Sequence, residues 1–151
     1  MTIDHSIGMR IAYEQALKSY NEGGIPIGGC LIRKSDGTIL SQGHNERVQK
    51  QSATLHGEIS VLEKAGRLPA SIYQDCVLYT TLSPCQMCSG SVLLYKIPTV
   101  VSGENENFKG PEEYLKSNGV EFINLEDEKC KELMSKFIKE KPEVWFEDIG
   151  V

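Results

Sequence analysis

Hydrophobic side chains near the start of the chain recur at the spacing of one helix face, at Met9, Tyr13, Ala16, Leu17 and Tyr20. This periodicity predicts an amphipathic helix, which Gly23-Gly24 would end. Two extended stretches follow at residues 25–33 and 38–42, and the Asp36-Gly37 pair between them indicates a β-hairpin. A polar loop at 49–52 then leads to a predicted helix over 56–65, which Gly66 closes.

The second half of the chain alternates between strands and helices. Residues 77–81, 99–102 and 120–125 have the composition of buried strands. Ser83 has the properties of a helix N-cap, with Pro84 at the tolerated first position and Gln86 completing a capping box. The sequence therefore predicts a helix from there to Tyr95. A last long helix carries one apolar stripe, formed by Cys130, Leu133, Met134, Phe137 and Ile138.

This order of elements predicts a single α/β domain over residues 1–151. Strands that alternate with helices after an initial hairpin favour a three-layer α/β/α sandwich around a mixed central sheet of about five strands. Hydrophobic residues make up 40% of the chain and charged residues 25%, an ordinary globular composition. That composition excludes disorder, collagen and coiled coil for the chain as a whole.

Charge and hydropathy narrow the expected partners. The formal net charge is −5, and no run of basic residues is present, so we expect no nucleic-acid partner. Apolar runs such as residues 92–95 are too short to span a bilayer, and the start shows no cationic stretch before an apolar block. We therefore expect no secretory signal and no membrane partner.

The chain has five cysteines, an odd number, and no secretory signal is expected. Both points argue against a disulfide framework. Metal binding or catalysis is then the favoured role for two cysteines that lie close together in the sequence. Cys30, Cys76 and Cys130 lie within apolar patterns and are interpreted as core residues. Cys85 and Cys88 are three residues apart at the start of a predicted helix, so both thiols can grip one ion. The helix N-terminus favours thiolate over thiol in that first turn.

A second motif, His56-Gly57-Glu58, opens the preceding helix. His56 and Glu58 are separated by about 200° of helix rotation, so they can serve one site only if it is approached along the helix axis at its N-terminus. Zinc accepts thiolate and imidazole together, and two cysteines with one histidine leave a tetrahedral position open for water. Glu58 would then lie beside the metal without binding it, which suits a proton shuttle.

Simpler explanations exist for each motif alone. His-x-Glu is often no more than an acidic first helix turn, and Cys-x-x-Cys can be a redox pair of the thioredoxin type or two buried cysteines. A structural zinc site would be closed by a fourth protein ligand, for which Cys30, Cys76 or His44 are candidates. A purely structural zinc site does not require a carboxylate such as that of Glu58 beside the metal. The two motifs together therefore favour a catalytic metal site.

The arrangement H-x-E…P-C-x-x-C is the signature of the zinc deaminases. The chain resembles the cytidine deaminase-like superfamily and, within it, the fungal-type cytosine deaminases. Five further segments carry this resemblance: residues 23–30, 43–45, 103–105, 107–109 and 145–150. The resemblance implies the cytidine deaminase-like fold and the zinc-dependent hydrolysis of free cytosine to uracil and ammonia. It also implies a role in pyrimidine salvage and turnover of 5-substituted cytosines such as 5-fluorocytosine.

The resemblance also implies roles for individual residues. His56, Cys85 and Cys88 would bind one Zn²⁺ per chain, with water or hydroxide as the fourth ligand. Glu58 would carry the water proton to N3 of the ring and then to the departing amine. The substrate-binding residues would be Asn45, Asp148, Gly57, Phe108 and Trp145.

Among these, Asn45 would hydrogen-bond the pyrimidine and Asp148 would contact its amine. The Gly57 N–H would hold the base oxygen, and the two aromatic rings would form walls. We further expect the tail at 142–151 to fold back as a lid over the site. A homodimer and a cytoplasmic localisation that extends to the nucleus are implied by the family only.

Other deaminases are the main alternatives. A tRNA adenosine deaminase should present a basic face for phosphate contacts, whereas this chain is acidic, with a net charge of −5. A deoxycytidylate deaminase would need cationic groups for the phosphate, and none cluster near the motifs. A guanine deaminase is a further alternative. The choice between nucleoside and free base stays open on physical grounds, because the preference for a free base rests on the tail resemblance. His5 and His44 have no motif around them.

Overall fold

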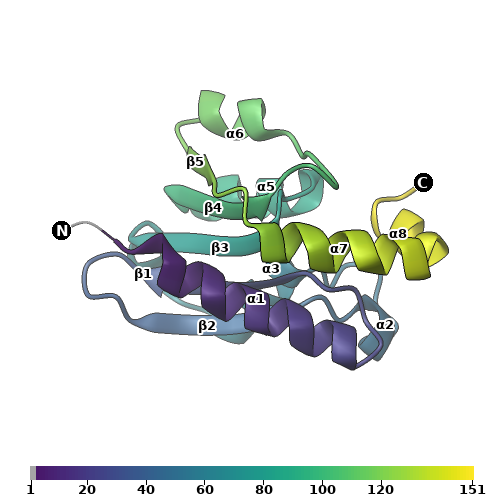
Figure 1. Cartoon of the computed structure of the whole chain (residues 1–151). Helices are drawn as coiled ribbons and strands as arrows, with labels where there is room; N and C mark the ends of the chain where they lie inside the picture. The colour runs from purple at the N-terminus through teal and green to yellow at the C-terminus, as the bar shows by residue number, and fades with distance from the viewer. Residues whose placement is uncertain (1–2) are drawn as a thin grey trace.

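A computed structural model describes residues 3–151 and shows one five-stranded sheet with helices on both faces (Figure 1). The strands are β1 (Gly28–Arg33), β2 (Ile39–His44), β3 (Cys76–Leu82), β4 (Thr99–Glu104) and β5 (Glu121–Asn124). The helices are α1 (His5–Asn21), α2 (Arg47–Lys50), α3 (Gly57–Ala65), α4 (Ala70–Tyr73), α5 (Gln86–Tyr95), α6 (Glu112–Ser117), α7 (Glu128–Glu140) and α8 (Pro142–Asp148).

The sheet is mixed, as the sequence predicts, with strand order β2-β1-β3-β4-β5. β1 runs antiparallel to both β2 and β3, whereas β3, β4 and β5 are parallel. The hairpin between β1 and β2 turns where Asp36-Gly37 indicates it: Gly37 has a φ of 74°, and the backbone N–H of Thr38 donates to Asp36 Oδ1 over 3.0 Å. A non-glycine residue would be strained at that φ.

Side chains alternate between two apolar layers along the strands, which confirms the three-layer sandwich. On one face, Cys30 and Tyr79 of the sheet pack with Met9 of α1 and Cys130 of α7. On the other face, Leu31 packs with side chains from α3, α5 and α6. Figure 1 shows α1 and α7 lying side by side across one face of the sheet. Successive strand residues point to opposite faces, so both must be apolar in a sheet covered twice.

A third apolar cluster lies at the end of the sheet where α8 packs against α7. It consists of Ile25, Ile27, Leu82, Met134, Phe137 and Trp145. Helix α7 ends at Glu140, and Pro142 occupies the first position of α8. An N–H at that position has no partner within the helix, so its absence in proline costs nothing. The C-terminal tail is therefore a short helix folded back onto the body of the protein.

The N-cap predicted at Ser83 is wrong. Helix α5 begins at Gln86 with Cys85 as its N-cap residue, two positions later than the capping-box pattern indicates. The hydroxyl of Ser83 instead donates to the carboxylate of Glu112 over 2.6 Å, a partner 29 residues away. A long-range acceptor outcompetes the local cap here. The short helices α2, α4 and α6 also lie outside the sequence predictions, because four to six residues give too little periodicity to detect.

Candidate active site

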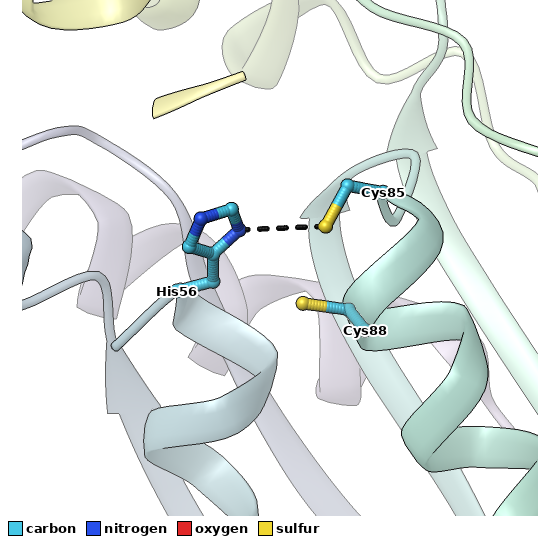
Figure 2. Close-up of side chains that lie close together, drawn as sticks. All are labelled: His56, Cys85 and Cys88. Carbon is cyan, nitrogen blue, oxygen red and sulfur yellow. Dashed lines mark hydrogen bonds between the residues drawn. The ribbon is translucent and has the colours of Figure 1, made fainter. Parts of the chain in front are cut away.

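Two helix N-termini face each other at the carboxyl end of β3, and they carry the three candidate metal ligands. His56 is the N-cap residue of α3, Cys85 is the N-cap residue of α5, and Cys88 lies in the first turn of α5. One donor atom from each lies within 4.8 Å of the other two. Figure 2 shows the imidazole and both thiols pointing toward one another.

The backbone holds these ligands at the ends of their helices. The carbonyl of His56 accepts the N–H of Ser60 over 2.9 Å, and that of Cys85 accepts the N–H of Ser89 over 2.8 Å. His56 and Cys85 thus begin the hydrogen-bond ladders of their helices, and neither side chain is used in a capping hydrogen bond. A Cβ at Gly57 would lie 3.0 Å from the carbonyl oxygen of Ile27, so a glycine lets the start of α3 approach the residue before β1 closely.

The donor geometry fits zinc. Zn–S and Zn–N bonds of about 2.3 and 2.05 Å at a tetrahedral angle separate the two donor atoms by about 3.6 Å. The structure places His56 Nδ1 3.5 Å from Cys85 Sγ. The other ring nitrogen, Nε2, lies 3.6 Å from Asp148 Oδ1, and a carboxylate in that place commonly orients a metal-binding imidazole.

The electrostatics of the three ligands favour charged forms on two of them. The hydrogen bond with Cys88, together with that to His56, lowers the pKa of Cys85 to about 4 against the effect of burial. Burial alone would lower the pKa of His56, but the hydrogen bond with Cys85 and the charge of Asp148 raise it. The hydrogen bond with Cys85 and burial raise the pKa of Cys88. Cys85 is therefore a thiolate at neutral pH, the form that binds metal.

Glu58 lies in the first turn of α3 and is 4% exposed. Burial, followed by the negative charge of Cys85, raises the pKa of Glu58 to about 7. A carboxyl with that pKa both accepts and releases a proton near neutral pH, which is the property of a general acid–base group. It is close enough to Cys88 to raise the pKa of that thiol as well.

Asn45 and Asp148 meet although 103 residues separate them in the chain. Asn45 directly follows β2, and its Nδ2 donates to Asp148 Oδ1 over 2.9 Å. Asn45 Oδ1 accepts the backbone N–H of Arg47 over 2.9 Å, which leaves one amide hydrogen and one lone pair for a ligand. Burial raises the pKa of Asp148, although His56 and Asn45 oppose that rise.

Phe108 and Trp145 pack edge to face with ring centroids 6.1 Å apart. Together with His56, Glu58 and Asp148 they line a cavity of about 10 Å³. That volume holds about one water molecule. An open groove of about 370 Å³ lies next to it and shares His56, Phe108 and Asp148 among its lining residues. Phe108 therefore lies between the enclosed space and the open groove, whereas Trp145 lines the enclosed space alone.

The structure brings the predicted site residues together: Asn45, His56, Gly57, Glu58, Cys85, Cys88, Phe108, Trp145 and Asp148 all lie at or next to this cavity. Sequence reasoning missed four residues that line it, namely Ile27, Leu82, Ser83 and Ile149. All four lie in segments that carry the family resemblance: Ile27 in residues 23–30, Leu82 and Ser83 in residues 81–85 at the start of the cysteine motif, and Ile149 in residues 145–150. That signal could have found them.

The candidates for a fourth protein ligand lie elsewhere. The thiol of Cys30 donates to the carbonyl of Gly8, and that of Cys76 to the carbonyl of Ile72. His44 contacts the carbonyl of Asn45 and the carboxylate of Glu22. Within residues 3–151, the group of three around His56 is the one that meets the geometric requirements of a metal site. The structure therefore supplies three ligands, as a catalytic zinc site requires.

Known proteins give the same indication. Residues 2–104 match the family model described as the cytidine and deoxycytidylate deaminase zinc-binding region. A cytosine deaminase of Candida albicans is 62% identical over 150 residues, which cover 99% of this chain and 99% of the relative. A tRNA-specific adenosine deaminase 2 of Xenopus tropicalis is 32% identical over 93% of this chain and 92% of its own length. The solved structure of a guanine deaminase from Nitrosomonas europaea superposes with a TM-score of 0.74 over 91% of this chain and 86% of that chain. At 21% identity it shows a shared fold alone.

Proposed function

The chain belongs to the family of cytidine and deoxycytidylate deaminases with a zinc-binding region, and we propose that it hydrolyses free cytosine to uracil and ammonia. The observation that carries this proposal is the 62% identity to a cytosine deaminase over 99% of both chains. That similarity includes the C-terminal helix α8, whose Trp145 and Asp148 reach the cavity. The adenosine deaminase relative is far less similar over a comparable length.

His56, Cys85 and Cys88 would hold one zinc ion per chain. Bound there, zinc supplies hydroxide near neutral pH because it lowers the pKa of a water molecule. Glu58 takes up the proton that the attacking water releases and delivers it to N3 of the pyrimidine. After the C4–O bond has formed, Glu58 takes the remaining proton from the new C4 hydroxyl and passes it to the amine. The C4–N bond then breaks, so that one water and one cytosine give uracil and ammonia. A carboxyl with a pKa of about 7 is suited to both transfers.

We assign the orientation of the base to groups on three different elements. The free hydrogen and lone pair of the Asn45 amide match the adjacent carbonyl and N–H of a small pyrimidine. The N–H of Gly57, at the first position of α3, would hold the base oxygen. Asp148 would accept from the exocyclic amine, and its bond to Asn45 fixes the spacing between these two contacts.

Phe108, Trp145 and Ile149 enclose the site and exclude bulk water, which strengthens electrostatic contacts inside it. The cavity of about 10 Å³ is too small for a pyrimidine, so the wall has to open for entry and release. We propose that α8 is the moving part, because it supplies Trp145 and Asp148 to the lining, is followed directly by the lining residue Ile149, and begins at Pro142. Its opening would contribute to the rate of product release.

The experiment that tests the function is a turnover assay. The purified chain, loaded with zinc, is given cytosine, cytidine, deoxycytidine monophosphate, adenine or guanine, and ammonia release is followed. We expect cytosine to be the best substrate by kcat/KM. A higher value for any of the other four would refute the proposed function. 5-Fluorocytosine is included as a further substrate. The proposed contacts involve other positions of the ring, so we expect a small substituent at C5 to be accepted.

We also propose that two copies of the chain form a homodimer through the outer side of α5. Leu94, Tyr95 and Met87 are 70%, 46% and 38% exposed on this helix. They line a groove of about 710 Å³ between α5 and α3. Exposed apolar residues grouped in this way are typical of an interface. Light scattering after gel filtration should give twice the chain mass, and Leu94→Glu should give a monomer.

A cytoplasmic and nuclear localisation is proposed as well. All five cysteines are free in the structure, which suits a reducing compartment. In the described residues, no helix combines the length and the apolar character needed to cross a membrane. Imaging of the tagged chain, with fractionation as the control, tests the localisation.

A further inference from the structure

The loop between β4 and α6, residues 105–111, carries Phe108 into the cavity wall. Two buried carboxylates flank this loop. Glu104 at the end of β4 is 0% exposed, and Glu112 at the start of α6 is 5% exposed. Neither has a role in the chemistry derived above, although burying a carboxylate is costly unless its oxygens are well satisfied.

Glu104 fixes the first half of the loop. Its Oε2 accepts the backbone N–H groups of Glu106 and Asn107 over 2.8 and 3.0 Å, and its Oε1 accepts Asn107 Nδ2 over 2.8 Å. The same amide of Asn107 donates to the carbonyl of Lys131 and accepts from the hydroxyl of Ser135, each over 3.2 Å. The residue directly before the aromatic ring is therefore fastened to the strand end and to α7.

Glu112 fixes the second half and joins it to the metal site. Its Oε2 accepts the hydroxyl of Ser83 over 2.6 Å, and both of its oxygens accept Asn105 Nδ2 over 3.2 and 3.3 Å. The Ser83 oxygen in turn accepts the backbone N–H of Gly110 over 3.0 Å. Ser83 lines the cavity and precedes Cys85 by two residues, so the loop and the metal-binding segment share one hydrogen-bond network.

The backbone of the loop presses against that same segment. A Cβ at Gly110 would lie 1.8 Å from the carbonyl oxygen of Pro84, so no side chain fits there. The backbone N–H of Ser83 donates to the carbonyl of Glu104 over 2.9 Å, which closes the connection between the strand ends. The loop thus has little room to shift without breaking contacts on both sides.

From this network we propose that Glu104 and Glu112 are positioning residues that hold Phe108 in the cavity wall and thereby set how tightly the site encloses its substrate. All of the donors described for the two carboxylates are uncharged amides and a hydroxyl. Hydrogen bonds to an ionised oxygen are shorter and stronger than neutral ones, so they hold the loop firmly in one place. The consequence for turnover rests on the proposed cytosine deamination.

Loss of this positioning should affect substrate binding more than the chemical step. Phe108 would move away from Trp145, and the enclosure would loosen on the substrate side. Glu58 and His56 lie on α3, outside the network, so proton transfer should change little. We therefore expect a rise in KM, a smaller change in kcat and weaker discrimination between cytosine and cytidine.

The test compares Glu104→Gln and Glu112→Gln with Glu113→Gln. Glutamine keeps the shape but turns an acceptor into a donor, which would face the donor groups of Asn107 or Asn105. Glu113 is the matched control on the same helix as Glu112, with its side chain 82% exposed. Zinc per chain, kcat and KM for cytosine and cytidine, and acrylamide quenching of the single tryptophan, Trp145, are measured for all three.

In both buried variants we expect about a tenfold rise in KM for cytosine, less than a threefold change in kcat, and stronger quenching of Trp145, with one zinc retained. Kinetics and quenching equal to those of the control would overturn the proposal.

If the variants do not fold, amide hydrogen exchange in the unaltered chain tests the proposal instead. The N–H groups of Glu106, Asn107 and Gly110 should be protected, and exchange at the rate of an open loop overturns the proposal. Quenching and exchange report on the position of the loop and do not depend on cytosine turnover. A wrong proposed function would show as a lack of cytosine turnover in the unaltered chain, and the two failures can therefore be told apart.

Discussion

The metal centre and the C-terminal helix differ in how the chain builds them. His56, Glu58, Cys85 and Cys88 lie at the starts of two helices that pack on one face of the sheet, and short motifs set their spacing. α8 reaches the same cavity from the far end of the chain, and it contacts Asn45 across 103 residues. The first region holds what any deaminase of this family needs. The second supplies the groups that we propose to face the substrate.

This difference suggests a division of labour. Substitutions in the motifs should abolish the chemistry whatever the substrate, because they remove the metal or the proton carrier. Substitutions in α8 should alter which substrates are accepted and how tightly, while the metal stays bound.

Replacement of a metal ligand should have the largest effect. In Cys85→Ser and Cys88→Ser, a hydroxyl replaces a thiolate that zinc prefers, so we expect severe loss of zinc and of turnover. Metal analysis by mass spectrometry, alongside the turnover assay, checks this. Cys76→Ser is the matched control, because Cys76 bonds to the carbonyl of Ile72 away from the site. Full metal content and activity in either ligand variant would show that the ligand assignment is wrong.

Glu58→Gln should keep the metal and lose the reaction. The amide preserves the shape of the side chain but cannot carry a proton, a function worth roughly 10²–10⁴-fold in rate. Zinc content and kcat are measured on the same preparation. Glu63→Gln, on the same helix, serves as control. Substantial turnover by Glu58→Gln with zinc still bound would show that Glu58 does not carry the proton and is only a buried acid at the start of the helix.

Removal of residues 142–151 should leave a folded, zinc-loaded protein that barely turns over cytosine. The deletion takes away Trp145 and Asp148 but none of the ligands on α3 and α5. We expect kcat/KM to fall by roughly 10²-fold or more, because water enters the site and the base loses its contacts. Circular dichroism and metal analysis establish that the protein is folded and loaded. An unchanged kcat/KM would mean that α8 contributes packing only.

The burial of Glu58 should also be visible in stability. Its pKa rises from an ordinary value of 4.5 to about 7 in the folded chain. The folded state therefore holds this proton more tightly than the unfolded state, and it loses stability as the pH rises from 4.5 to 7. In the zinc-free protein, Glu58→Gln should raise the free energy of unfolding relative to the parent by roughly 3 kcal/mol more at pH 8 than at pH 4. Urea titrations at the two pH values measure this, and an equal effect at both would contradict the raised pKa.

Much of the fold and the metal centre can be predicted from the sequence, because the signals are local. The hairpin turn at Asp36-Gly37, the helix that starts after His56 and the Cys85–Cys88 pair all depend on neighbours a few residues away. Ser83 shows where local reasoning fails. It has the composition of a cap, but its hydroxyl is taken by Glu112, 29 residues along the chain.

The substrate side of the site depends on such distant contacts. The pairing of Asn45 with Asp148 has no local signature, and an aspartate near a C-terminus is ordinarily a solvated charge. Its role could be expected only from the resemblance to related chains. The helical form of residues 142–148 and the buried network around Glu104 arise from packing against α7, which periodicity in a short segment does not reveal.

The most direct test of the account is the ratio of kcat/KM for cytosine to that for cytidine, measured for the intact chain and for Trp145→Ala with one zinc bound in each. Trp145 is 4% exposed and lines the cavity together with His56 and Cys85. The account predicts that the intact chain strongly prefers cytosine. In the variant that ratio should fall by about tenfold while zinc content is unchanged. An equal ratio in both proteins would contradict the claim that the C-terminal helix determines whether the metal centre acts on the free base or on its nucleoside.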